Sequence, residues 1–360
     1  MHHKFLKSML LCGGLAAVIL FASQMNAQQL TLEGQTGGFI TPTAYVVPSA
    51  NDHSFSLPAV GFHFVDASSV IGNVETISVT EGFGNRFEFG YTSSLHQAGN
   101  SAMFSALWSK QDFAAYSSGY PSSTISGMNV FHGKVVVVKE NTKHFYTPGF
   151  AVGGVYRQGD HYVSGSLSDA VLGKANQTYG NGDIYGAVTK TWAKPPVPVL
   201  LNFGVKGTNA VVFGLGGVAE SWSARPFGGI GIPLPLGKSV VAVPSAGFAS
   251  EPSNIKNLDE LLATYGAALD YYDGTTAYAN NRPHIPTTLD YAVRFTQRKD
   301  AHFSVDIGVG QLANNIGTIA VPNPAAGVSC SPSPSCPVLF AVPISLDARH
   351  VFGFGISFRP

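Results

Sequence analysis

Large apolar side chains occupy every second position in several stretches of this sequence, and this alternation is the strongest constraint on its fold. The clearest example is the C-terminal stretch RHVFGFGISFRP. Its apolar residues are Phe352, Phe354, Ile356 and Phe358, and they alternate with small or polar residues. Because successive side chains of a β-strand point to opposite faces of a sheet, the pattern predicts a strand with one apolar face.

The composition favours a membrane protein built from such strands. Charged residues make up only 12% of the 360-residue chain, about half the share that is usual in soluble domains. A spanning helix needs about 20 consecutive apolar residues, and the longest wholly aliphatic run after residue 30 is residues 135–138. Apolar residues spread over alternate positions are typical of a transmembrane β-barrel.

We therefore predict an all-β fold, a closed antiparallel transmembrane β-barrel of about 12 strands, within a range of about 10 to 14. Each expected strand has about the length that a tilted strand needs to cross a bilayer. The expected strands are residues 54–64, 74–81, 86–92, 130–139, 149–158, 183–193, 199–207, 224–232, 238–248, 288–297, 301–310 and 347–359.

The connections between these segments alternate between short and long. Outer-membrane barrels have short turns on the periplasmic side and longer loops outside, so the long connections are predicted to be outer loops. One of them holds residues 257–272, whose leucines and tyrosines recur at helical spacing and predict a short loop helix. The short connections are 82–85, 140–148, 194–198, 233–237 and 298–300, and the longest are 95–129, 159–182, 249–287 and 311–346.

The N-terminus is expected to direct export. Residues 1–27 combine Lys4 and Lys7 with an apolar run and a small residue, Ala27, which predicts a cleaved signal peptide. Residues 28–50 are then a glycine-rich segment in the periplasm or the lumen, and residues 51–360 form the barrel in the outer membrane. Without residues 1–27 the chain keeps 21 − 2 = 19 basic and 21 acidic residues, and no basic patch indicates nucleic-acid binding.

Two cysteines remain after the signal peptide, Cys330 and Cys336. In an oxidising compartment they are expected to form a disulfide that closes a small loop, with two free thiols as the alternative. Their spacing and the lack of nearby histidines do not indicate a zinc site, and no metal or cofactor is expected.

Charged side chains on the faces opposite the apolar residues are candidates for the lumen lining. They predict either a polar passage for small solutes or an interior that is packed and ion-paired, because a 12-stranded barrel lies between the filled 8-stranded and the open 16-stranded barrels. A turn at 298–300 would pair Phe295 with Phe303 and make Arg294 and Asp306 diagonal neighbours. The candidates are Arg86, Glu88, His132, Lys134, Arg157, Lys206, Asp290, Arg294, His302, Asp306 and Arg349.

Enzyme signatures are absent from the sequence: it has no G-x-S-x-G, no H-E-x-x-H and no phosphate-binding loop. We therefore do not expect an enzyme. The first expectation is a narrow passive channel or transporter for an unidentified small solute. A non-conducting envelope-assembly or adhesion barrel that acts through its loops is the alternative. An outer-membrane lipid hydrolase is a third possibility, because a catalytic triad spread over strands leaves no motif.

Five segments resemble a known family, in the order LEGQTGGFITPTAYVVP, EGFGNRFEFGY, GDIYGAVTKTW, PVLLNFGVKGT and HFSVDIGVGQLA. They are similar to bacterial outer-membrane β-barrel proteins of an uncharacterised family, defined by a domain of unknown function, over most of residues 31–315. The stretch from Gly37 to Ala44 is also similar to barrels associated with exopolysaccharide assembly. The C-terminal strand resembles the recognition signal of the barrel-assembly machinery, although it ends on Arg359-Pro360. The apolar face of the C-terminal strand is expected to contact membrane lipid. The resemblances imply the barrel-assembly machinery as a partner, and they supply no catalytic residues.

Overall fold

The computed structural model describes the barrel wall and the segment that precedes it. The described residues are 29–67, 72–97, 125–141, 144–160, 179–192, 198–210, 212–214, 218–252, 271–272, 277–278, 287–297, 302–313, 317–322, 339–344 and 350–360. The predicted signal peptide, Arg349, Cys330 and Cys336 therefore lie outside the described residues. None of the described residues form a helix that is long and apolar enough to cross a membrane.

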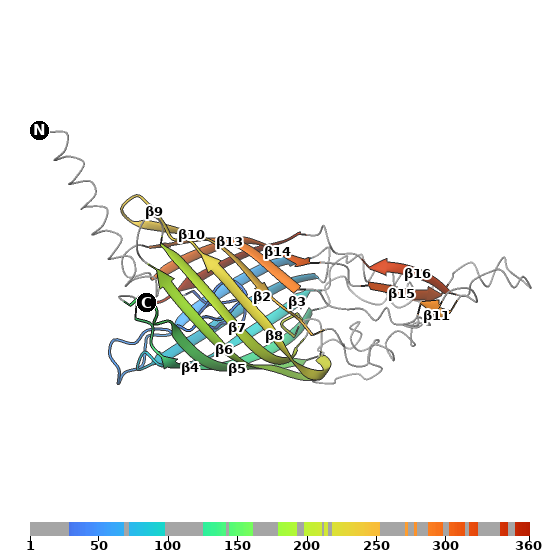
Figure 1. The fold of residues 1–360 in the computed structure, drawn as a ribbon, viewed down its shortest axis with the longest axis horizontal. Coiled ribbons are helices and arrows are strands. Elements are labelled where there is room, and N and C mark those ends of the chain that lie inside the picture. Colours follow the sequence, from blue (N-terminus) through green and yellow to red (C-terminus); the bar gives the residue numbers. More distant parts are fainter. Residues whose placement is uncertain are drawn as a thin grey trace, which may run out of the picture.

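The fold is a closed antiparallel β-barrel, as the alternation predicts (Figure 1). Its sheet has 13 strands, and all of them except the three-residue β9 (Leu234–Leu236) form the barrel wall, so the predicted number of 12 is confirmed. The wall strands are β1 (Ala59–Ala67), β2 (Gly72–Phe83), β3 (Phe87–Gln97), β4 (Ile125–Val138), β5 (Gly149–Asp160), β6 (Tyr179–Trp192), β7 (Val199–Ala210), β8 (Val218–Gly231), β10 (Val240–Ala249), β13 (Thr287–Gln297), β14 (Phe303–Ala313) and β17 (His350–Phe358).

Pairing of the first and last strands closes the sheet. β1 pairs with β17 in antiparallel register, with Phe62 opposite Ile356, so neither strand leaves an open edge toward the bilayer. The strands run steeply tilted around the barrel (Figure 1). This is the architecture of an outer-membrane β-barrel.

Short and long connections alternate along the chain as expected. We call the end of the barrel that carries the short turns, such as the one at Gly84 and Asn85 between β2 and β3, the short-turn end. Both residues of this turn have positive φ, 62° and 53°, which suits glycine and asparagine best. The C-terminus lies at the same end (Figure 1).

Two of the long connections contain strands that the sequence did not predict. β15 (Gly317–Pro322) pairs with β16 (Leu339–Ile344), and β11 (Tyr271–Tyr272) pairs with β12 (Ala277–Tyr278), each as a separate two-stranded sheet. The helix predicted at 257–272 falls outside the described residues, except that its last two residues form β11 instead.

The predicted register of the hairpin β13–β14 is wrong by two residues. Phe295 lies opposite Val305, not Phe303, and Arg294 lies directly opposite Asp306. The register differs because the connection is longer than the three-residue turn expected from the sequence: the last paired residues are Thr296 and Ser304. A shift by two residues keeps every side chain on its predicted face.

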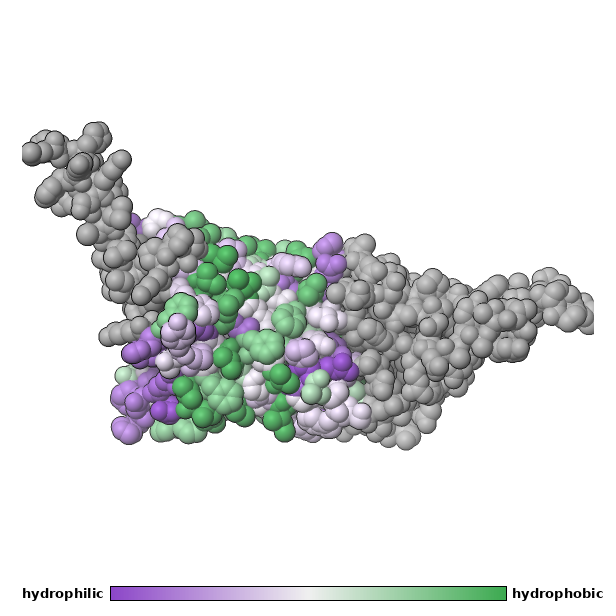
Figure 2. All heavy atoms as spheres, in the orientation of Figure 1, coloured by the Kyte–Doolittle hydropathy of each residue, from purple (hydrophilic) through white to green (hydrophobic). Residues whose placement is uncertain are grey.

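The two faces of the wall differ in chemistry. Outward residues are large and apolar, such as Phe203, Ile184 and Trp222, which expose 55%, 66% and 54% of their surface. Figure 2 shows hydrophobic side chains over the middle of the barrel wall and hydrophilic ones toward both of its ends. On β17 the residues Phe352 and Phe358 are exposed, whereas Gly353, Gly355 and Ser357 are buried inside the barrel. The outward face therefore suits contact with lipid.

Candidate functional site: a filled lumen

The residues before β1 fill the inside of the barrel. Residues 29–50, which we call the plug, are buried almost throughout. The plug folds back on itself through isolated bridges between Leu30 and Thr36 and between Gly37 and Pro42. It forms no strand and does not extend the sheet. An irregular segment at membrane depth needs partners for its backbone groups, and the barrel wall supplies them.

Glu88 on β3 is the centre of one set of contacts. Its carboxylate accepts hydrogen bonds from the backbone N–H groups of Thr36 and Val47, both at 3.0 Å, and from the Thr36 hydroxyl. Lys134 on β4 forms an ion pair with Glu88 at 3.0 Å and donates to the Thr36 carbonyl at 2.9 Å. One buried ion pair of the wall therefore binds both backbone groups of Thr36.

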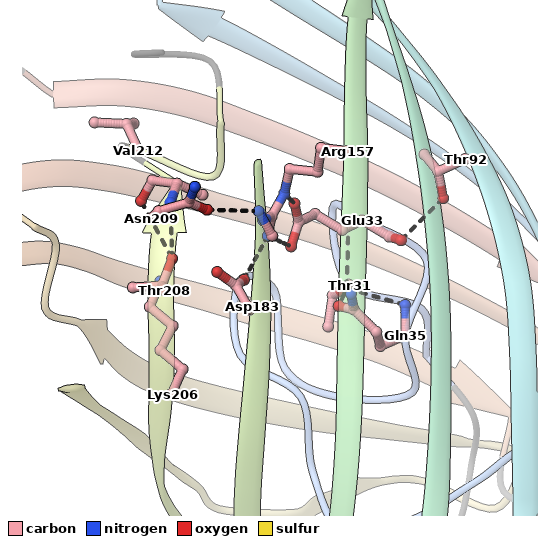
Figure 3. A network of polar contacts seen from close by, with 12 residues as sticks. Thr31, Glu33, Gln35, Thr92, Arg157, Asp183, Lys206, Thr208, Asn209 and Val212 are labelled. Carbon is pink, nitrogen blue, oxygen red and sulfur yellow. Dashed lines mark hydrogen bonds and ion pairs between the residues drawn. The ribbon is translucent and has the colours of Figure 1, made fainter. Parts of the chain in front are cut away.

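A second set of contacts surrounds Arg157 on β5, which is fully buried (Figure 3). Its guanidinium group pairs through Nε and Nη2 with Glu33 of the plug, with the Nη2–Oε2 distance at 2.8 Å. The same Nη2 donates to Asp183 on β6 at 2.6 Å. One cation thus lies between two carboxylates, one from the plug and one from the wall. Such a buried triad depends on all its members, because removing one leaves an uncompensated charge.

Other wall side chains bind plug backbone groups along its length. The hydroxyls of Thr80 and Thr92 donate to the carbonyls of Gly34 and Glu33 at 2.7 and 2.9 Å. Further wall donors and acceptors continue this pattern toward the short-turn end. Asn202 donates to the Pro42 carbonyl at 2.9 Å, Arg294 donates to the Gly37 carbonyl at 3.3 Å, and the Ala44 N–H donates to the Thr189 hydroxyl at 2.8 Å.

Apolar contacts complete the filling. Phe39 and Ile40 of the plug belong to a buried cluster with wall residues such as Tyr185 and Phe227. The Phe39 ring also packs on the edge of His63, with 5.7 Å between the ring centroids. Between plug and wall lies a cavity of about 20 Å³, lined among others by Gln35, Asp183 and Lys206. This is space for about one water molecule, much less than a sugar or an amino acid needs.

Polar side chains also form hydrogen bonds at the two ends of the barrel. At the short-turn end, Lys190 donates to the carbonyls of Asn141 and His144 at 3.0 and 2.9 Å, and Glu140 accepts from the hydroxyl of Tyr45. Burial raises the pKa of Tyr45, with the charge of Glu140 as a second cause. The phenol therefore stays protonated and acts as the donor.

At the opposite end, Glu251 lies two residues beyond the end of β10. It pairs with Lys206 at 3.4 Å and accepts from the Val212 N–H at 3.1 Å. Burial raises the pKa of Glu251 to about 7, despite the nearby Lys206. Its charge therefore changes within the neutral range.

The structure places most of the predicted lumen residues inside the barrel, and brings several together. Arg86 is an exception, because it lies exposed in the turn before β3. His302 lies at the barrel rim, where its Nδ1 is 2.8 Å from the Arg359 carbonyl, and Arg349 lies outside the described residues. The inward residues are Glu88, His132, Lys134, Arg157, Lys206, Asp290, Arg294 and Asp306.

Sequence reasoning missed several members of these networks. Asp183 and His63 stand at alternate positions of their strands, on the buried face, and a strict period of two extended over the whole strand would have found them. Glu33 and Glu251 precede and follow strands, so no periodicity points to them. In the described part of the chain, no three residues among His, Cys, Asp and Glu are placed to hold a metal ion.

Comparison with known proteins gives only distant similarities. No family model and no curated protein matches the sequence, so the predicted family resemblance stays a prediction. Among solved structures, the β domain of the Bordetella autotransporter BrkA is 10% identical, with a TM-score of 0.34, over 85% of this chain and 100% of that chain. CdiB from Acinetobacter baumannii is 7% identical, with a TM-score of 0.32, over 84% of this chain and 60% of that chain.

Salmonella typhi OmpF, solved in complex with daunomycin, is 7% identical, with a TM-score of 0.27, over 87% of this chain and 99% of that chain. Identities and TM-scores this low say nothing about the activity of the present chain. The chain is an outer-membrane β-barrel by its own sheet topology, with a lumen that its own N-terminal segment fills.

Proposed function

We propose that this protein is a non-conducting outer-membrane barrel that acts through its long loops, at the end opposite the short turns. The observation that supports this proposal is that the plug is hydrogen-bonded and ion-paired to the barrel wall. Wall side chains contact it from Gly34 to Val47, and an ion pair joins its Glu33 to Arg157. Of the functions that the sequence left open, the envelope-assembly or adhesion barrel fits this interior better than the passive channel.

The energetics of the interior support a closed barrel. If the plug left the lumen, Glu88 and Arg157 would lose buried charge-assisted hydrogen bonds, and each such bond contributes about 1.5–3 kcal/mol. A passage that is permanently open would lack these interactions. The connections outside the described residues, such as 98–124 and 161–178, are the proposed contact regions for envelope partners, and lipid is the proposed partner of the outward face. No role as an enzyme is proposed.

The similarity of Gly37 to Ala44 to barrels of exopolysaccharide assembly lies inside the plug. It agrees with a role in building the envelope.

A gated passage is the second candidate, and one observation favours it. The plug joins the wall through an exposed connection that includes Asn51, Asp52 and His53, and the wall behind it carries charged residues. If the plug moved out as a unit, this connection could accommodate the movement, and a polar passage would open.

A disulfide lock distinguishes the two candidates. A Cβ atom added at Gly149 on β5 would lie 3.4 Å from the Cβ of Ala44 in the plug, close to the separation of about 3.5–4.5 Å in disulfides. The double variant Ala44→Cys, Gly149→Cys, with Cys330 and Cys336 replaced by serine, should therefore join plug and wall when oxidised.

Conductance in planar bilayers is then measured for the wild type and for the lock in its oxidised and reduced forms. We expect no discrete conductance in any of the three. Wild-type conductance that disappears when the lock is oxidised and returns when it is reduced would favour the gated passage. Conductance that persists in the oxidised lock would contradict the filled lumen itself.

A further inference from the structure

The contacts inside the barrel have the character of a binding site for a peptide. We propose that the lumen of this barrel is a peptide-binding site, that residues 29–50 are its resident ligand, and that it takes a glycine-rich peptide of this pattern as a separate molecule. This goes beyond the proposed function, because it concerns what the lumen recognises and not what the long loops contact.

The wall recognises backbone groups of the plug. Glu88 accepts from two plug N–H groups, at Thr36 and Val47. The wall donors that reach plug carbonyls are Lys134 to Thr36, Thr80 to Gly34, Thr92 to Glu33, Asn202 to Pro42 and Arg294 to Gly37. Main-chain hydrogen bonds supply affinity in many peptide-binding proteins, while pockets for selected side chains supply specificity.

One charged pair adds selectivity for the ligand's side chains. Glu33 is the plug residue whose carboxylate binds Arg157, and Arg157 is pre-oriented by Asp183 on the neighbouring strand. Bidentate pairing of a guanidinium with a carboxylate depends on geometry as well as charge. A peptide without an acidic residue at this position would leave Arg157 with Asp183 alone.

Glycine at position 34 is required by the wall. Gly34 has a φ of 88°, and a Cβ atom there would lie 2.5 Å from the Thr92 hydroxyl oxygen and 3.0 Å from the Cβ of Ser78. The backbone therefore approaches β2 and β3 more closely than any other residue type permits. Gly38 differs, because a Cβ there would meet its nearest atom, the Thr41 hydroxyl oxygen, at 3.4 Å, which is ordinary contact.

The covalent connection between ligand and site is exposed. Asn51, Asp52 and His53 lie at the surface, and they join the last buried residues of the plug to the wall. Cutting this connection would convert the plug into a free peptide without removing any of the wall contacts named above.

The experiment uses the full chain with a protease site inserted between Asp52 and His53. The protein is folded in detergent micelles and cut, and the two pieces are unfolded in urea. They are then refolded with an equal amount of labelled synthetic peptide 29–50, and the label that stays with the barrel on size exclusion is measured. Three labelled peptides are compared: the natural sequence, Gly34→Ala and Gly38→Ala.

We expect the natural and Gly38→Ala peptides to be incorporated within about twofold of each other. The Gly34→Ala peptide should be incorporated at least about tenfold less, because alanine rarely adopts a backbone conformation with positive φ; tenfold corresponds to about 1.4 kcal/mol. Equal incorporation of the two alanine peptides, or loss of the cut segment with no incorporation of any peptide, would overturn the proposal.

Wall variants extend the test. Glu88→Gln should reduce incorporation of the natural peptide, because it removes the charge from two plug N–H contacts. Glu81→Gln on β2, which replaces the same residue type outside the plug contacts described above, should not. Equal incorporation by both variants would mean that Glu88 does not hold the ligand. The readout is binding, so it is independent of the conductance that tests the closed barrel.

Discussion

The inner and outer faces of the wall strands tolerate different side chains, and β17 has both kinds of face. Its outward Phe352 exposes 48% of its surface and only has to be apolar. Its inward Gly353 and Gly355 face specific partners, because a Cβ at either position would lie within 2.6 Å of the ring of Phe39 or His63. Outside, the bilayer accepts any large apolar side chain. Inside, the plug and the wall accept only a particular shape and charge.

Several glycines of the wall show the same difference between the faces. On the inward face, a Cβ at Gly204 would lie 2.2 Å from the Phe227 ring. On the outward face, a Cβ at Gly133 or Gly207 would meet its nearest atom at 3.8 Å. Interiors are close-packed, so a change inside should be costly in proportion to the partners it disturbs. A change outside should matter when it introduces charge, or when the backbone is close, as at Gly182 and Gly228, where a Cβ would lie 2.6 and 2.8 Å from a carbonyl oxygen.

The largest effect is expected from the buried cation. Arg157→Met should lower the free energy of unfolding by about 3–5 kcal/mol, because it leaves Glu33 and Asp183 buried without their shared partner. Urea unfolding of the purified barrel measures this change. Arg225→Met is the control, since Arg225 on β8 is only partly buried and bonds to Ser223 of its own strand. Similar losses in both variants would show that the triad is not specially important.

A charge on the outer face should come next. Phe203→Arg, near the middle of β7, should cost about 2–4 kcal/mol, because an arginine side chain at the bilayer midplane is poorly solvated. Refolding yield into lipid vesicles measures this cost, and Phe203→Leu is the apolar control. Normal refolding of Phe203→Arg would mean that this face of β7 does not meet lipid.

Matched glycine substitutions compare the faces directly. Gly355→Ala should destabilise the barrel by about 1–3 kcal/mol, as overpacking does, because the new methyl group would lie 2.5 Å from the His63 ring. Gly133→Ala should change stability by no more than about 0.5 kcal/mol. If the thermal unfolding midpoints of the two variants move equally, the inner face is not packed as described.

The smallest expected effect is the pH dependence that Glu251 contributes at the end of the barrel opposite the short turns. The pKa of Glu251 is raised from 4.5 to about 7, so the folded protein binds this proton more tightly than the unfolded chain. Stability is then greatest below pH 4.5 and falls as the pH rises through 7, by about 1 kcal/mol between pH 6 and pH 8. Urea unfolding at these two pH values measures the difference. Glu251→Gln should remove this part of the pH dependence, and an unchanged slope would assign it to another group.

The alternation in the sequence determined the fold class, the number of wall strands and the face of nearly every strand residue. It also placed Glu88, Lys134, Arg157 and Asp306 on the inner face, because a period of two identifies the face of a side chain without knowledge of its neighbours. The same reasoning failed for Arg86, which belongs to a turn where no period applies.

Only the tertiary structure determined which residues contact one another inside the barrel. Glu33 and Arg157 are 124 residues apart in the chain, and nothing local in either segment indicates the other. Arg294 lies opposite Asp306 because of the length of their connection, which alternation does not encode. The sequence therefore left open whether the lumen was a passage or a packed interior. That outcome depends on an irregular segment whose backbone bonds to many strands at once, and such contacts form only when the barrel has closed around it.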